Sequence, residues 1–164
     1  MEPLEELQFA VSSAISHATS QQLAYHPEGK WSSGQILEHL YLSYTGTIKG
    51  FERILQAGKP QVMTPNFKQR VGALLVLRLR YMPSGREAPK AARPKGLPTD
   101  QVLSEILPRI GEMDALLSQC AQKLGRGKLL DHPILGPLTA EEWKIFHLVH
   151  GMHHVKQIRR LMRA

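Results

Sequence analysis

The sequence predicts an all-α protein built as a four-helix bundle. Four long stretches have the apolar spacing and the end signals of helices, and little of the chain has the alternation of a strand. The links between them differ in length, because two are short and the middle one is long. Packing four amphipathic helices around one core is the simplest way to bury their apolar faces.

The first two helices follow from their end signals. The first is predicted from about Pro3 to Leu23, where the turn residues of the HPEGK segment end it. The second begins after Ser32, because Gln35 stands three residues further on and completes a capping box. It continues to about Ala57, just before a glycine.

A polar stripe on the second helix predicts the face that meets solvent. This stripe recurs at helical spacing and consists of Glu38, Thr45, Lys49, Glu52 and Gln56.

The middle connection has mixed character. A short helix could form within residues 67–80, whereas prolines and glycines predict a long loop from Met82 to Pro98. A connection of this length can join two neighbouring helices that run parallel. We therefore expect up-down-down-up topology, with a long crossover between helices two and three.

The second half of the chain holds the other two helices. The third is predicted from Thr99 to about Gly125, with a kink or a break at Pro108. The DHPILGPL segment that follows is expected to be a loop. Thr139 and Glu142 then form a capping box that begins the fourth helix, whose end is rich in basic residues.

Length and composition limit the class of protein. The 164 residues fit a single domain, residues 1–164, and a composition of 42% hydrophobic and 21% charged residues is typical of a globular protein. Neither a membrane span nor a secretory signal is evident, so we expect no membrane partner. The single cysteine, Cys120, excludes an internal disulfide and suits a cytoplasmic location. The net charge is +7, but the basic residues are not interleaved with aromatic residues as in a single-strand binding surface. We therefore expect no specific nucleic-acid partner.

Three histidines are the candidate metal ligands. His150 and His154 are spaced i, i+4, which places both imidazoles on one side of the fourth helix. Two such histidines can bind one divalent metal, and His39 from the second helix would be a third ligand that leaves positions open. The alternative is that they are core histidines with hydrogen-bond partners.

Two further residues are candidates for roles around that metal. His147 could be a fourth ligand, a hydrogen-bond donor to a ligand, or a proton shuttle. Gln157 lies one turn beyond His154 and could hold an imidazole tautomer or a metal-bound water. The remaining histidines form no pattern, and they include His17, His26 and His132.

Two motifs resemble a known family. The pattern W-x(4)-I-L-E-H-L around His39, and H-x-x-H-H-x-x-Q-I from His150, resemble the DinB-like (DinB/YfiT-like) metalloenzyme superfamily. The segment HPILGPLTAEEWKIFHLVHGMHHVKQI is particularly similar to a poorly characterised bacterial branch of it. The resemblance implies a four-helix bundle of up-down-down-up topology with a divalent metal held by His39, His150 and His154.

The resemblance also implies a class of activity. Members of this superfamily catalyse metal-dependent hydrolysis or transfer and isomerisation with low-molecular-weight thiols. We therefore expect a metal-dependent hydrolase or thiol transferase that activates water or a small thiol against a small-molecule substrate. Histidine nitrogens suit several ions, so Zn or Ni is expected first, with Fe, Mn or Cu as alternatives. A homodimer is plausible for such a bundle.

A non-catalytic protein is the alternative hypothesis. The same bundle could hold its metal structurally, or hold none, and act as a binding or interaction module through its basic surface. Known catalytic motifs do not decide between the two hypotheses, because the sequence lacks H-E-x-x-H, G-x-S-x-G and a Walker loop.

Overall fold

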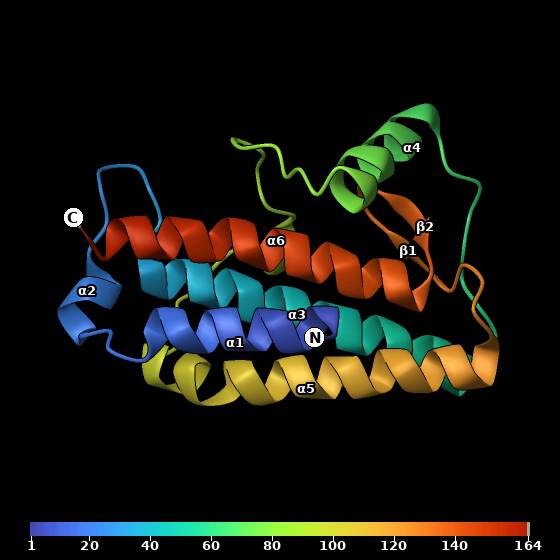
Figure 1. Ribbon diagram of the computed structural model, residues 1–164, viewed down its shortest axis with the longest axis horizontal. Coiled ribbons are helices and arrows are strands. Elements are labelled where there is room, and N and C mark those ends of the chain that lie inside the picture. The colour runs from blue at the N-terminus through green and yellow to red at the C-terminus, as the bar shows by residue number, and fades with distance from the viewer. Residues whose placement is uncertain (164) are drawn as a thin grey trace.

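Four main helices dominate the computed structural model, which describes residues 1–163, and they lie side by side along its length (Figure 1). These helices are α1 (Pro3–Ile15), α3 (Ser33–Ala57), α5 (Thr99–Leu124) and α6 (Ala140–Leu161). The prediction of a mainly helical protein is confirmed. The last residue of the predicted domain, Ala164, lies outside the described residues.

Shorter elements fill the connections between these helices. They are α2 (Ser20–Ala24), α4 (Phe67–Ala73), the π-helical turn η1 (Leu74–Arg78), the 3₁₀ turn η2 (Lys90–Ala92), and the strands β1 (Leu130–His132) and β2 (Gly136–Leu138).

The predicted first helix is interrupted. Helix α1 ends at Ile15, and α2 begins only after Thr19, so a continuous helix to Leu23 was wrong. The Thr19 hydroxyl accepts a hydrogen bond from the backbone N–H of Gln22, whose side-chain oxygen accepts one from the backbone N–H of Thr19. This capping box starts a new helix and therefore ends the old one.

The DHPILGPL segment is a β-hairpin rather than a loop. Strands β1 and β2 pair antiparallel, with Leu130 opposite Leu138 and His132 opposite Gly136. Gly136 has a φ of +74°, which a side chain would disfavour, and this permits the return of the chain. Each strand is only three residues long, so the alternation that indicates a strand is too short to recognise.

Helix α5 continues through Pro108, so the predicted break was wrong. A proline in a helix removes the N–H that would bond to the carbonyl four residues earlier, here Ser104. Both residues are exposed, and water can satisfy that carbonyl.

Both predicted capping boxes are confirmed and fix where the two histidine-bearing helices begin. Ser32 Oγ accepts from the N–H of Gln35 at 3.1 Å before α3, and Thr139 Oγ1 accepts from the N–H of Glu142 at 3.1 Å before α6. The core between the helices includes fully buried side chains from all four of them, such as Leu7, Tyr44, Phe51, Ile106, Met113 and Ile158.

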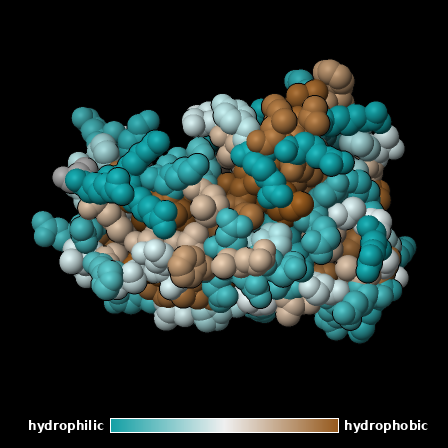
Figure 2. Space-filling view, viewed as in Figure 1, coloured by the Kyte–Doolittle hydropathy of each residue, from teal (hydrophilic) through white to brown (hydrophobic). Residues whose placement is uncertain are grey.

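Helix α3 packs against α5, and α1 packs against α6. Helices α3 and α6 are also in contact. None of the helices in residues 1–163 is both long and apolar enough to cross a membrane. Apolar side chains gather on the surface over α4 and η1 (Figure 2), including the exposed Phe67 and Leu74.

Candidate metal centre

Ring nitrogens of three histidines from two helices lie close together. His39 lies in the second turn of α3, and His150 and His154 lie one turn apart on α6. The Nε2 atom of His150 is 3.0 Å from Nε2 of His39 and 3.1 Å from Nε2 of His154. One nitrogen from each residue can be chosen so that all three lie within 4.8 Å of one another. Residues separated by 111 positions in the chain are thus brought together.

The other ring nitrogen of two of these histidines has a fixed partner. His39 Nδ1 lies 2.7 Å from the carbonyl oxygen of Ala92, which only accepts, so Nδ1 carries the proton. His154 Nδ1 lies 2.7 Å from Oε1 of Gln157, whose amide nitrogen is 3.1 Å from Nε2 of His153. In both His39 and His154 the proton is therefore on Nδ1, and the unprotonated Nε2 faces His150.

This arrangement fits a cation. The Nε2 atoms of His39 and His154 both present lone pairs to Nε2 of His150, and one proton there could be donated to only one of them. Two nitrogens bound to the same ion at about 2.1 Å and at right angles would stand about 3 Å apart, which is the spacing found. The donor set therefore fits a divalent metal.

The electrostatics keep the three rings in the form that binds metal. Burial lowers the pKa of His39, and this effect outweighs the hydrogen bond that the ring donates to the Ala92 carbonyl, which raises the pKa. Burial, and next the neighbouring histidines, place the pKa of His150 well below its usual range. Burial and the His39 ring lower the pKa of His154 to about 4. All three are neutral at pH 7, as ligands must be.

Comparison with known proteins supports the fold. The family model described as "Protein of unknown function (DUF1569)" matches residues 1–161. The chain belongs to the DUF1569 family. Among solved structures it is similar to YfiT from Bacillus subtilis, with a TM-score of 0.62 and 22% identity over 98% of this chain and 82% of that one. YfiT is described as "a probable metal-dependent hydrolase with an unusual four-helix bundle topology". No curated protein matches.

These comparisons confirm the fold that the resemblance predicted. The similarity to YfiT extends over nearly the whole of this DUF1569 protein, so the DinB/YfiT-like fold and the four-helix bundle are shown.

Glu38 precedes His39, and the prediction that it faces solvent was wrong. In this DUF1569 protein its side chain is 3% exposed and accepts hydrogen bonds from the backbone N–H groups of Lys95, Gly96 and Leu97, at 2.6, 3.3 and 3.1 Å. The carboxylate therefore holds the segment before α5 against α3. The same segment supplies the Ala92 carbonyl to His39, so the two neighbouring side chains hold one loop.

His147 is buried one turn before His150, at 1% exposure. Its Nε2 is 2.9 Å from Oγ1 of Thr47, and its ring stacks on Trp143 at 28° with centroids 5.8 Å apart. Burial, with a smaller effect of His132, lowers its pKa to about 3. His147 lies outside the three converging nitrogens, whereas Gln157 contacts one of the ligands directly.

His132 forms no recognisable pattern in the sequence, yet it is buried at 7% exposure. Its ring packs on Phe146 and Trp143, with centroids 4.2 and 5.1 Å away. The signal that could have found it is the short segment His132-Pro-Ile-Leu-Gly136, because a polar side chain before a proline and a glycine can cap a turn.

Proposed function

We propose that this protein is a metal-dependent hydrolase whose divalent ion is bound by His39, His150 and His154. The convergence of their Nε2 lone pairs, with the Nδ1–H groups of His39 and His154 donated elsewhere, is the observation that carries the proposal. A divalent ion held by three neutral nitrogens supplies Lewis acidity that makes water a nucleophile near neutral pH.

Other residues of the chain would keep the ligands in place. The Ala92 carbonyl and the Gln157 amide hold the tautomers of His39 and His154, and Phe146 stacks on the ring of His150. His147 is proposed to act from outside the ligand set, because its Nε2 is engaged by Thr47.

The choice of ion and of reaction follows from the donor set and from the neighbouring structure. Zn or Ni is proposed first, with Fe or Cu as alternatives because imidazole also suits them, and Mn last because it prefers oxygen ligands. Hydrolysis of a small-molecule substrate is preferred to thiol transfer because YfiT is described as a probable hydrolase. A thiol co-substrate and the cytoplasmic location stay predictions. So does a homodimer, for which the apolar surface over α4 offers a candidate face.

We further propose that the four helices form one domain of up-down-down-up topology. In support, the colours in Figure 1 give the direction of each helix: α1 and α6 run toward the end of the molecule near α2, and α3 and α5 run away from that end. The segment of residues 58–98 would then be the crossover.

Metal analysis of the untagged protein tests the proposed function. We expect about one divalent ion per chain, and loss of that ion with its hydrolytic activity in His154→Ala. The matched control is His17→Ala, an exposed histidine of the first part of the chain, which should keep the ion. Unchanged metal content in His154→Ala would refute the ligand assignment, and metal binding without any hydrolysis across an ester, amide and phosphoester screen would refute the activity.

A further inference from the structure

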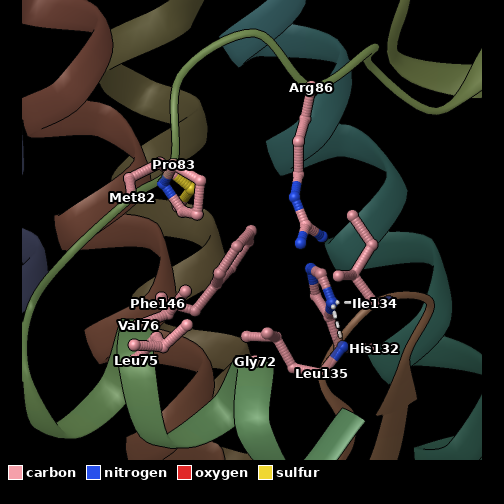
Figure 3. Close-up of a pocket in the computed structure, with 10 residues that line it drawn as sticks. All are labelled: Gly72, Leu75, Val76, Met82, Pro83, Arg86, His132, Ile134, Leu135 and Phe146. Atoms are coloured by element: carbon pink, nitrogen blue, oxygen red, sulfur yellow. Dashed lines mark hydrogen bonds between the residues drawn. The ribbon is translucent and has the colours of Figure 1, made fainter. Parts of the chain in front are cut away.

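A cavity lies beside the proposed metal centre, under the proposed crossover segment (Figure 3). Its volume of about 50 Å³ exceeds the roughly 10–15 Å³ that one water needs. The inner walls are apolar and include Leu75 and Val76 from the region of η1, Leu135 from the hairpin and Phe146 from α6. None of the three proposed metal ligands lines it.

One polar group at this cavity is the imidazole of His132. Its Nδ1 accepts hydrogen bonds from the backbone N–H groups of Ile134 and Leu135, at 3.1 and 3.2 Å. Since Nδ1 accepts, the proton of the neutral ring is on Nε2. Among residues 1–163 nothing accepts a hydrogen bond from that Nε2–H, although the side chain is only 7% exposed. This nitrogen faces the cavity, where its N–H can donate to a bound molecule (Figure 3).

The second polar group is the guanidinium of Arg86. It reaches from the crossover segment toward the free nitrogen of the His132 ring, on the open side of the cavity (Figure 3). Arginine only donates, and within the described chain Arg86 pairs with no carboxylate, while the neighbouring Glu87 pairs with Arg93. Two groups that can only donate therefore face one another.

We propose that this cavity binds a small organic carboxylate with a short apolar tail. The carboxylate would lie between Arg86 and His132 Nε2–H and would accept from both, which pairs each donor with an acceptor. The tail would lie among Leu75, Val76, Leu135 and Phe146, where it would be removed from water. The apolar walls and the single guanidinium favour such a monoanion over a phosphate.

This site is next to the metal centre but does not depend on it. Phe146 forms part of the cavity wall, and its ring stacks on His150 at 5.3 Å with an interplanar angle of 12°. The proposed donors, Arg86 and His132, contact none of the metal ligands through a hydrogen bond. Binding can therefore be measured on chelated protein, so that its failure is separate from failure of the metal proposal.

The experiment is a titration of the chelated full-length chain with sodium acetate, butanoate and hexanoate, followed by NMR of the His132 ring. The ring signal is assigned as the one that disappears in His132→Asn. We expect a saturable shift of this signal, with affinity rising roughly fourfold for each added methylene until the cavity is full. 1-Butanol, which has the tail without the charge, should bind at least about tenfold more weakly than butanoate.

Variants of the exposed Arg86 decide between a specific site and general charge attraction. Arg86→Gln should weaken butanoate at least about tenfold, and Arg86→Lys should recover part of that loss. Lys90→Gln is the matched control, since it removes one positive charge from the same exposed segment and should leave the affinity unchanged. The proposal is overturned if no saturable shift occurs at His132, if Arg86→Gln binds like the wild type, or if Lys90→Gln weakens binding equally.

Discussion

The ring of Phe146 lies almost parallel to the imidazole of His150, with centroids 5.3 Å apart and planes 12° from parallel. The same phenylalanine contacts the His132 ring, at a centroid distance of 4.2 Å. One apolar side chain therefore contacts a proposed metal ligand and also forms part of the wall of the neighbouring cavity. Such support holds the rotamer of the ligand, and a ligand held in place loses less entropy when it binds.

Replacement of Phe146 by leucine tests this support. We expect Phe146→Leu to lower the free energy of unfolding by about 1–2 kcal/mol, because the smaller side chain leaves part of the contact empty. Metal affinity should fall by about tenfold, since His150 becomes free to rotate. Competition titration with a metal-binding dye gives the affinity, and Phe9→Leu is the control because Phe9 is 69% exposed. Equal affinities in the two variants would contradict the role of the ring.

The contact between Gln157 and His154 leads to a second prediction. Leucine at position 157 cannot accept from His154 Nδ1–H, so the tautomer that presents Nε2 loses its fixed partner. We expect Gln157→Leu to weaken metal binding by about 10- to 100-fold while the helix content measured by circular dichroism stays unchanged. Gln56→Leu, an exposed position of α3, should leave metal affinity unchanged. An unaltered dissociation constant in Gln157→Leu would show that this contact does not orient the ligand.

The carboxylate of Glu38 gives a third prediction about the crossover segment. A glutamine there keeps one acceptor oxygen but loses the charge, so three backbone N–H groups compete for a weaker partner. Glu38→Gln should cost about 1–3 kcal/mol of stability. It should also increase hydrogen exchange at the amides of Lys95 and Leu97, whereas Glu52→Gln on the exposed face of α3 should not. Unchanged exchange at these amides would show that the segment is held by other contacts.

The helices and the shared side of His150 and His154 could be predicted from sequence because their signals are local. Capping boxes at Ser32 and Thr139 fix the starts of two helices, and the i, i+4 spacing of His150 and His154 follows from helix geometry alone. Local signals also existed at Thr19, where a third capping box starts α2, but the apolar periodicity across it gave a competing prediction of one longer helix.

The surroundings of the ligands could not be predicted in the same way, because they depend on contacts distant in the chain. Glu38 looks solvent-exposed on its own helix, and only the backbone of a segment 57 to 59 residues away makes its burial favourable. The partner of His39 is a carbonyl oxygen at Ala92, and a backbone group leaves no trace in the side-chain pattern. His132 is buried by a hairpin too short to be recognised from its sequence.

His132 also gives a prediction about pH. Burial lowers its pKa to about 4, whereas the unfolded chain should titrate near 6.5, so between these values the unfolded state binds more protons. Stability is therefore complete above about pH 6.5 and falls as the pH drops toward 4, by about 2 kcal/mol between pH 7 and pH 5 for this one group. Urea unfolding of chelated protein at several pH values measures this change in the free energy of unfolding. His132→Asn, whose side-chain oxygen can still accept from the turn, should show a shallower fall, while His17→Asn should match the wild type. Identical slopes in His132→Asn and the wild type would contradict the assignment.

The close approach of α1 to α6 leads to the last prediction. A methyl group at Gly151 would stand 2.2 Å from Cδ1 of Leu7, a buried side chain with little freedom to move. Gly151→Ala should therefore force α6 away from α1 and cost about 1–3 kcal/mol, although alanine is intrinsically the better helix former. Gly151 lies between His150 and His154, so the same shift should weaken metal binding.

Two further variants make this prediction specific. Gly46→Ala introduces the same methyl group on α3 where nothing lies within 4 Å, and it should raise stability by up to about 1 kcal/mol. Leu7→Ala removes the atom that collides, so in the double variant the cost of Gly151→Ala should largely disappear relative to Leu7→Ala alone. Urea unfolding of the wild type, the three single variants and the double variant measures both effects. If Gly151→Ala costs the same in either background, the contact with Leu7 is not what requires a glycine beside the metal ligands.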